Sequence, residues 1–481
     1  MKILLKVIVC LIIFYIYSPW FLFTKTLSAG DWPYLFKENI LAFQILEPPF
    51  LWLDPYYQLT AKMGVIYLSL SWEITEKLFW FFPFLIISII SSWKFTNYIF
   101  RKIIGHNISI IFSIISSLVF SSNTYILMIV GGGQMGVGMA YALAPLVTVY
   151  FIELLDHEKV ESHHYLKTII TSSLQLTFDP RIFIITLLTI SIYELFIILN
   201  NKILLKTYFK KYSIILFCSI ILNLYWILPN TQQFSHTYDE VASKIEASYY
   251  SFATFENTIS ILHPNWPENI FGRIHFMRFE FLFLPIFAYL SLIFLKGVKT
   301  KYRLLSLSVI GLIGAYLSKG TNDPGGIFYL WLSTLPGFMI FRDPTKFYLM
   351  TILSYMILIP LSLFFLTSRL FKPIKYLPII LFIIFWFYLL LPVWQSDLNG
   401  TFKPSTIPTE YILFRKFIIN QTDNYSILWI PKKQRFGFYS ENFPYIDAET
   451  MFDTLDRKQL MELFPKSRTL SLLRSEKVKY V

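Results

Sequence analysis

The stretch "YLMTILSYMILIPLSLFFLTS" (348–368) decides the class of fold. It contains no charged residue, and an apolar helix of about 20 residues crosses the roughly 30 Å hydrocarbon core of a bilayer. The chain as a whole has the same character, because 55% of its 481 residues are hydrophobic and only 15% are charged. A typical soluble domain carries about 25% charged residues. We therefore predict a polytopic membrane protein.

Other apolar runs predict further membrane helices. A shorter run, 166–178, ends in "FDPR" (178–181), where Pro180 breaks the helix before the chain returns through the membrane. Such a break is tolerated where protein or water surrounds the freed backbone. With this short or re-entrant segment the count is about eleven, and the predicted fold class is an all-α membrane protein. The predicted spans are 3–23, 78–97, 108–130, 137–155, 182–199, 212–229, 280–295, 304–318, 348–368 and 377–394.

The basic residues predict the orientation in the membrane. Short loops on one side are rich in Lys and Arg, as in Lys206, Lys210, Lys211, Lys301 and Arg303, and short basic loops stay in the cytoplasm. This pattern predicts a multi-pass protein of the cytoplasmic (plasma) membrane, with its N-terminus inside and its C-terminus outside. The net charge of +12 belongs largely to these loops, so we predict no nucleic-acid partner.

The predicted outer side carries the long segments. Residues 1–394 form the predicted membrane domain, with extracytoplasmic loops 24–77, 230–279 and 319–347. Residues 395–481 form a predicted extracytoplasmic domain of α+β type, or an incomplete part of one. Within it, "YSILWIPKK" (425–433) alternates like a strand, "DTLDRKQLMELF" (453–464) is helix-like, and "VKYV" (478–481) ends the chain on a strand-like run.

The first outer loop opens with "LSAGDWPYLF" (27–36), in which Asp31 follows the first predicted span. A carboxylate at an apolar boundary is a candidate general base. Helix capping or plain solvation is the alternative. Further carboxylates of this loop are candidates to join Asp31 around a divalent cation, since hard cations bind clustered oxygens, or they are simply solvated. They are Glu38, Glu47, Asp54, Glu73 and Glu76.

A second candidate is "PGFMIFRDPTKFYLM" (336–350), just before a late span. If the helix begins at its second proline, Asp343 suits the N-cap, whereas Lys346 opposes the helix dipole in the first turn. Arg342 and Lys346 are therefore candidates for binding a phosphate, Arg as a bidentate fork and Lys as a compact charge.

Two further stretches allow either a structural or a functional interpretation. In "TFDPR" (177–181), Asp179 and Arg181 either form a local ion pair or face a functional cavity, because ionisable groups at membrane depth are costly. In "GGGQMGVGMAYALAP" (131–145), small residues permit close helix packing, and the following helix start could hold an anionic phosphate.

The Gly–Asp pair at 30–31, "FDPR" and "FRDPTKF" (341–347) together resemble the polytopic GT-C glycosyltransferases, and more narrowly the cell-wall α-(1→3)-arabinofuranosyltransferase type. The final "LSLLRSEKVKYV" (470–481) also resembles a segment of such proteins. The likeness covers most of the chain in topology, although its motifs are short. The larger arabinofuranosyltransferases carry a long extracytoplasmic region with carbohydrate-binding modules, which the short tail here does not match.

The resemblance implies an activity and roles for residues. A sugar such as arabinofuranose would move from a polyprenyl-phosphate donor to a cell-envelope glycan or lipid acceptor on the extracytoplasmic side. Asp31 would be the general base, and Arg342 and Lys346, with Arg181 as the weaker candidate, would bind the donor phosphate. Metal dependence varies among these enzymes, so a divalent cation (Mg²⁺, Mn²⁺ or Ca²⁺) stays an open alternative.

Two other classes of function fit the sequence. A lipid or polysaccharide transporter or flippase would use the broken helices near a substrate site, although no repeat relates the two halves of the chain. A non-catalytic envelope assembly subunit would bind a partner through the tail. Uptake into proteoliposomes without sugar transfer would favour the transporter.

Overall fold

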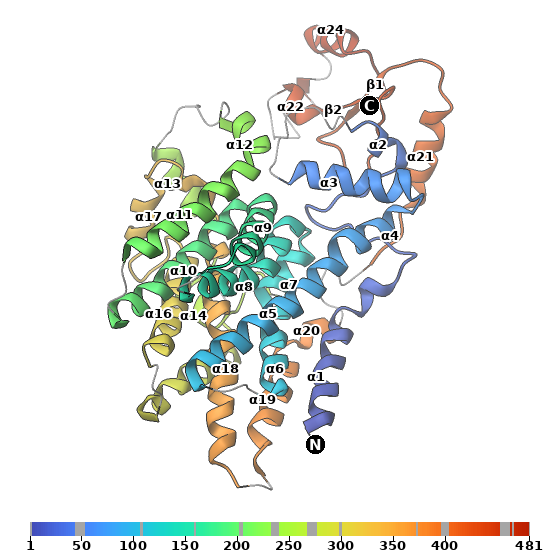
Figure 1. Cartoon of the computed structure of the whole chain (residues 1–481). Coiled ribbons are helices and arrows are strands. Elements are labelled where there is room, and N and C mark those ends of the chain that lie inside the picture. The colour runs from blue at the N-terminus through green and yellow to red at the C-terminus, as the bar shows by residue number, and fades with distance from the viewer. Residues whose placement is uncertain are drawn as a thin grey trace. The chain divides into compact units, whose positions relative to one another are not determined.

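The computed structural model describes the whole chain except residues 1, 44–52, 106–108, 158–159, 202–204, 232–239, 267–276, 298–300, 372–373, 396–403, 453–461, 464–465 and 481. The chain is mainly helical and divides into two compact units (Figure 1). The first unit comprises Met1–Ser18, Pro48–Leu53 and Trp80–Asn399. The second comprises Pro19–Glu47, Asp54–Phe79 and Gly400–Val481.

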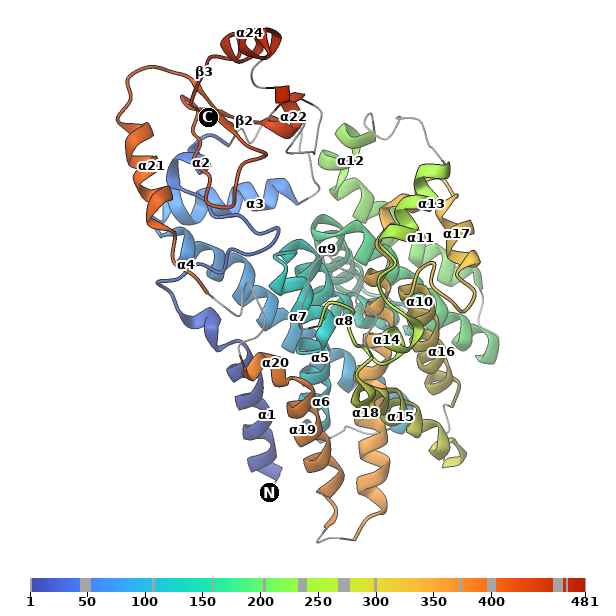
Figure 2. The ribbon, with the colours of Figure 1, turned by 180° about the vertical axis from the view of Figure 1, so that it is seen from behind.

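The first unit is a bundle of helices (Figures 1 and 2). Its long helices are α1 (Lys2–Ile16), α5 (Phe82–Ile104), α6 (Ile110–Ser121), α8 (Met135–Asp156), α9 (Ser162–Phe178), α10 (Pro180–Asn201), α11 (Leu205–Leu222), α16 (Lys301–Ser318), α18 (Tyr348–Arg369) and α19 (Leu377–Leu389). Its short helices are α7 (Thr124–Gly131), α12 (Leu224–Thr231), α13 (Glu240–Tyr249), α14 (Phe255–Ile259), α15 (Phe283–Tyr289), α17 (Ile327–Ser333) and α20 (Leu391–Trp394), with 3₁₀ turns at η5 (Phe279–Leu282), η6 (Leu290–Gly297), η7 (Phe338–Phe341) and η8 (Pro344–Phe347).

Four helical stretches of the described chain are long and apolar enough to cross a membrane: Trp72–Ile104, Met135–Asp156, Pro180–Asn200 and Pro344–Arg369. The pair α6 and α7, bent by 47°, adds a fifth if it counts as one span. The structure thus confirms a mainly helical protein with several helices that could span a membrane, while the count of eleven stays a prediction. The first predicted span is shorter than expected, because α1 ends at Ile16, ahead of Pro19.

The helices differ in how much of their surface other helices cover. Within their most apolar windows, α8 is 89% buried and the α18 span 83% buried, whereas the α10 span is 50% buried. The exposed large apolar residues of α10 include Ile184, Leu188, Leu195 and Leu199, which recur at helical spacing and form one stripe. This stripe is suited to contact lipid, whereas α8 and α18 form the protein interior.

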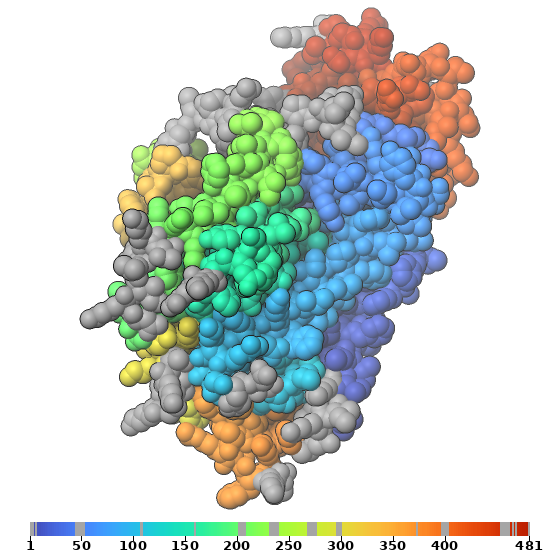
Figure 3. Space-filling model, viewed as in Figure 1, coloured from blue at the N-terminus to red at the C-terminus, as the bar shows by residue number. Residues whose placement is uncertain are grey.

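Small side chains let the inner helices approach closely. A Cβ atom added at Gly314 of α16 would lie 2.6 Å from the Met350 Cβ and 2.7 Å from the Thr351 nitrogen of α18. Between α5 and α6, hydroxyl pairs join Ser92 to Ser117 at 2.8 Å. Close backbones and interhelical hydroxyl bonds are typical of helix packing in membranes. On the outer surface, α9 and α11 adjoin (Figure 3).

The helix break predicted at "FDPR" is present, since α9 ends at Phe178 and α10 begins at Pro180. The glycine-rich stretch turns between α7 and α8, where Gly133 has a φ of 81° that favours glycine. Gly136, in the first turn of α8, would bring an added Cβ to 3.1 Å from the Phe178 carbonyl oxygen. The start of α8 therefore packs against the end of α9, as the packing interpretation predicted.

The second unit combines helices with a small sheet. Its helices are α2 (Lys37–Leu41), α3 (Asp54–Ala61), α4 (Trp72–Glu76), α21 (Thr409–Ile419), α22 (Ala448–Phe452) and α24 (Ser467–Ser475), with η1 (Ser18–Phe21), η2 (Lys62–Tyr67) and η3 (Lys77–Phe81). The parallel sheet has the order β2-β1-β3, formed by β1 (Ser426–Trp429), β2 (Tyr445–Asp447) and β3 (Val478–Tyr480). The strands predicted within 425–433 and 478–481 are present. The helix predicted at 453–464 lies almost entirely outside the described residues.

Candidate functional site

Two helices of the first unit begin in the same way, with Asp, Pro and then a cation. Before α10, the Asp179 Oδ1 accepts the backbone N–H groups of Arg181 at 2.9 Å and of Ile182 at 3.2 Å. Before η8, which leads into α18, the Asp343 Oδ1 accepts the Thr345 N–H at 3.0 Å and its hydroxyl at 2.6 Å. Each aspartate is thus an N-cap. The proline that follows suits the first helical position, because an N–H there would find no partner within the helix and proline has none.

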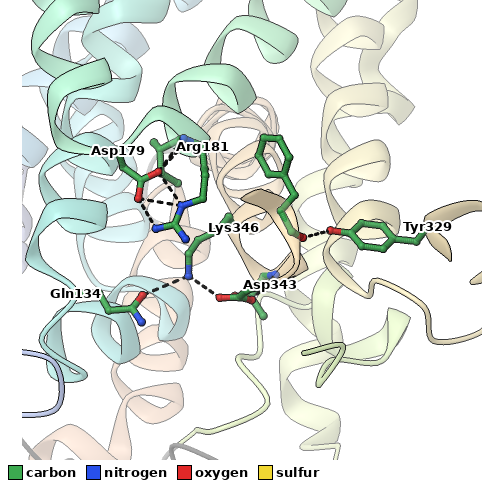
Figure 4. A network of polar contacts seen from close by, with 9 residues as sticks. Gln134, Asp179, Arg181, Tyr329, Asp343 and Lys346 are labelled. Atoms are coloured by element: carbon green, nitrogen blue, oxygen red, sulfur yellow. Dashed lines mark hydrogen bonds and ion pairs between the residues drawn. The ribbon is translucent and has the colours of Figure 1, made fainter. Parts of the chain in front are cut away.

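Each cap also pairs with the cation of its own motif (Figure 4). Arg181 donates to Asp179 through Nη2 at 2.6 Å and through Nε at 3.1 Å and 3.2 Å. The Lys346 Nζ donates to the Asp343 Oδ2 at 2.6 Å and to the Gln134 Oε1 at 3.3 Å. Because α10 packs against η8, the two predicted motifs, far apart in the sequence, lie near each other beside the start of α8 (Figure 4). We call these five residues the charged cluster.

Burial changes the ranking of the predicted phosphate contacts. Lys346 and Asp179 are 2% and 1% exposed, whereas Arg181 is 24% exposed. Arg342 is 53% exposed, pairs with Glu246 at 3.1 Å, and has no described contact with the charged cluster. Sequence reasoning favoured Arg342 and Lys346 over Arg181. In the structure Arg181 is the cation of the cluster that a ligand can reach, and Lys346 holds the cluster together from within.

Aromatic rings pack beside the charged cluster. Tyr125 of α7 stacks on Tyr348 of α18, with ring centroids 5.4 Å apart and planes 6° apart, and the His263 ring lies 6.1 Å and 6.2 Å from them. The buried hydroxyl of Tyr125 has no hydrogen-bond partner among the described residues. Buried polar atoms are nearly always hydrogen-bonded. A bound ligand that accepted or donated a hydrogen bond here would supply the partner that the Tyr125 hydroxyl lacks.

Burial and nearby charges set the protonation states of Asp343 and of the neighbouring His263. Burial raises the pKa of Asp343, but the Lys346 ammonium and the bonds from Thr345 outweigh it and lower that pKa to about 2. Burial lowers the pKa of His263 to about 4, while Asp343 raises it and Lys346 lowers it. At neutral pH the imidazole is therefore uncharged and the aspartate is ionised.

The positive potential for an anion comes from helix ends. Two cations balance two carboxylates within the cluster, so its side chains are neutral overall. However, α8, α10 and η8–α18 all begin here, and each helix N-terminus carries about half a positive charge. This potential favours an anion such as phosphate. The arrangement can hold a phosphate against Arg181, with Lys346 positioning Asp343 and Gln134.

Asp31 belongs to the second unit, where its side chain is exposed rather than enclosed by apolar residues. The loop that carries it is firmly held. Gly30, with a φ of 50°, makes the turn before it, and Arg435 donates to the Ser28 carbonyl at 2.9 Å. The Trp32 ring packs edge-on against Tyr57 at 5.4 Å. The structure thus presents the carboxylate on an ordered loop.

Sequence reasoning named Glu76 as a possible cation ligand, and its role as a buried hydrogen-bond acceptor was not predicted. Glu76 is 0% exposed and accepts the Leu27 N–H at 2.6 Å, the Trp32 indole N–H at 3.1 Å and the Thr26 hydroxyl at 3.1 Å. Its position in the sequence gave no signal, because its donors come from residues about fifty positions earlier. Glu76 therefore fixes the loop around Asp31.

Two of the carboxylates named as possible divalent-cation ligands already bind other groups in the structure. Glu76 already binds N–H and O–H groups, and Glu38 forms a bidentate pair with Arg415 at 2.6 Å and 3.0 Å. Glu47 lies outside the described residues, and within the described part of the chain no three His, Cys, Asp or Glu side chains gather as metal ligands. We derive no chemical step through a metal.

Comparison of the chain with protein-family models, curated proteins and solved structures gives no match. The resemblance to GT-C glycosyltransferases accordingly stays a prediction.

Proposed function

We propose that this protein is a membrane glycosyltransferase of GT-C type that takes a sugar from a polyprenyl-phosphate donor. The observation that carries the proposal is the meeting of "FDPR" and "FRDPTKF" in one charged cluster, beside the starts of three helices. A phosphate needs an accessible cation and a positive potential, and Arg181 and these helix ends supply both. A purely structural ion pair would need neither the partial exposure of Arg181 nor the orphaned Tyr125 hydroxyl.

In the proposed reaction the acceptor hydroxyl oxygen attacks the anomeric carbon of the donor sugar. The bond from that carbon to the phosphate oxygen breaks, and the lipid phosphate leaves with the electron pair. Arg181 stabilises the charge that develops on this phosphate, an electrostatic effect aimed at the transition state. Asp31 takes the proton of the acceptor hydroxyl as general base. Arabinofuranose is the proposed sugar, and a cell-envelope glycan or lipid the acceptor.

The proposed setting is the cytoplasmic (plasma) membrane, with the N-terminus inside and the C-terminus outside. The basic short loops support this orientation. The polyprenyl-phosphate sugar would enter from the outer leaflet, and both the charged cluster and Asp31 would act on that side.

The test compares Arg181, which belongs to the charged cluster, with Arg342, which forms an exposed ion pair outside it. Arg181→Gln should lower transfer from a polyprenyl-phosphate arabinofuranose donor about 100-fold, the usual loss when one transition-state donor is removed. Arg342→Gln removes the same charge from an exposed pair and should leave transfer within about twofold. Asp31→Asn should abolish transfer while expression and thermal stability stay unchanged. Equal activity of Arg181→Gln and wild type would refute the phosphate role, and an active Asp31→Asn would remove the base.

A transporter or flippase is the second candidate. The bend of 47° between α6 and α7 and the break between α9 and α10 favour it, because transporters place substrate at discontinuous helices. Proteoliposomes separate the two functions. Movement of a polyprenyl-phosphate lipid across the bilayer without glycosidic bond formation would replace the glycosyltransferase proposal with this one.

A further inference from the structure

A second polar region lies at the other end of α8 from Gln134. A cavity of about 700 Å³ opens there between α5 and α8. Its lining includes Lys94, Arg101 and Lys102 from α5, and Glu153 and Asp156 from α8. None of these residues takes part in the charged cluster, and the region is independent of the proposed glycosyl transfer.

The cavity-lining residues of α5 change from apolar to basic along the helix. Ile90 and Trp93 are 53% and 47% exposed, Lys94 follows Trp93, and Arg101 lies in the last turn. At 1.5 Å per residue, Ile90 and Arg101 are about 16 Å apart along the axis. Since α5 belongs to a candidate membrane span, the lining runs from apolar to basic toward the end of that span. A phospholipid changes in the same order, from acyl chain to anionic headgroup.

The carboxylates of the lining are already neutralised. Asp156 binds Lys102 at 2.7 Å and lies 3.8 Å from Arg303, which stands outside the lining. Glu153 binds Lys167, also outside it, at 2.5 Å. Among the described ion pairs neither Lys94 nor Arg101 takes part, and the Lys94 Nζ donates only to a tyrosine hydroxyl in the described contacts. The cavity therefore has an excess of positive charge.

In the described contacts, Lys94 and Arg101 do not bind the last carbonyl groups of α5 or α8. Cations often gather at helix C-termini, where they bind the last carbonyl groups. At the end of α8, however, Lys211 already binds the Leu154 carbonyl at 3.0 Å and the His157 carbonyl at 2.6 Å. At the end of α5 the Gly105 N–H binds the Arg101 carbonyl at 3.0 Å. Lys94 and Arg101 are thus available to an external anion.

We infer that this cavity binds a phosphate-bearing anion through Lys94 and Arg101, with Ile90 and Trp93 against an acyl chain when that anion is a phospholipid. The lipid is the favoured source, because a soluble phosphate would make no use of the apolar part of the lining. Basic pockets between membrane helices are known to hold anionic headgroups.

The experiment measures lipid binding to the purified full chain by native mass spectrometry, with phosphatidylglycerol and phosphatidylcholine of identical acyl chains. Wild type should prefer phosphatidylglycerol. Lys94→Gln/Arg101→Gln should weaken its binding about 30-fold, equivalent to about 2 kcal/mol for two cations near the headgroups. The control Lys210→Gln/Lys301→Gln removes the same charge from exposed helix positions outside the cavity and should bind as wild type does.

Lys94→Arg/Arg101→Lys keeps both charges and should keep the preference, which separates lost binding from lost folding. Undiminished binding of phosphatidylglycerol by the glutamine variant, or equal binding of both lipids by wild type, would overturn the inference. Displacement of phosphatidylglycerol by millimolar inorganic phosphate or glycerol 3-phosphate would support the phosphate site and overturn its assignment to a lipid.

Discussion

The pair of Lys346 and Asp343 allows a quantitative test of the charged cluster. Lys346 is 2% exposed and its ammonium lies 2.6 Å from the Asp343 carboxylate. Removing one partner of a buried ion pair costs about 3–5 kcal/mol, because the other charge is left without compensation. Asp343 is 26% exposed, so water partly solvates it and the lower end of that range applies. We expect Lys346→Met to lower the free energy of unfolding by about 3 kcal/mol.

Asp343→Asn completes a double-mutant cycle without loss of the helix cap. An Asn side chain keeps the oxygen that accepts the Thr345 N–H, so only the charge is removed. Lys346 would then be buried with Gln134 as its remaining described partner, and the cost should again be about 3 kcal/mol. The double variant leaves neither charge behind and should cost only about 1 kcal/mol, so the two single costs exceed it by a coupling energy of about 5 kcal/mol.

The assay is reversible unfolding in mixed micelles with increasing dodecyl sulfate, followed by tryptophan fluorescence. A loss of 3 kcal/mol corresponds to a change of about 100-fold in the unfolding equilibrium constant. Arg342→Met, next to the pair but exposed, is the matched control and should change stability little. Single costs that add within about 0.5 kcal/mol would refute the coupling and with it the role of Lys346 as the interior support of the cluster.

Three further predictions concern other parts of the chain. Burial lowers the pKa of His263 from 6.5 to about 4, so the folded state favours the neutral imidazole. The free energy of unfolding should therefore be unaffected by this residue above pH 6.5 and fall by about 3 kcal/mol between pH 6.5 and 4. His263→Asn should flatten this pH dependence in micelle unfolding. Gly314→Ala should cost about 1–3 kcal/mol, seen as a lower thermal midpoint, because its Cβ would meet that of Met350 at 2.6 Å, and an unchanged midpoint would contradict the close packing. Glu76→Gln should cost about 1–3 kcal/mol and speed hydrogen exchange in the loop of Trp32, since an amide replaces one acceptor oxygen; unchanged exchange there would show that Glu76 does not hold the loop.

The helices were predictable from the sequence because their signals are local. Apolar runs and their prolines place the break between α9 and α10, and Asp343 followed by Pro344 indicates a helix start. The end of α1 was predicted too late, because the run of apolar letters continues past the helix into Pro19. Hydropathy measures transfer to lipid, and it does not detect the backbone restriction that a proline imposes on the residue before it.

The site was predictable only in its local parts. The pairing of Asp179 with Arg181 follows from their spacing, whereas the burial of Lys346 and its bond to Gln134 depend on helices far apart in the chain. The sequence could not show that Arg181 belongs to the cluster while Arg342 is exposed and pairs with Glu246, since exposure is a property of tertiary packing. Glu76 was named from the sequence only as a possible cation ligand, and its role in holding the loop could not be predicted because its donors lie in another segment of the chain.

The self-pairing of the two Asp–Pro starts has a consequence for biosynthesis. An isolated ion is expensive to pass through hydrocarbon, and a newly made chain meets the membrane before its helices have assembled. In both motifs the counterion lies within one helical turn of its carboxylate, so each hairpin can enter the translocon already neutralised. Assembly of the cluster then brings together two ion pairs that have already formed, instead of four separate ions. The order in which the two segments enter the membrane therefore need not matter.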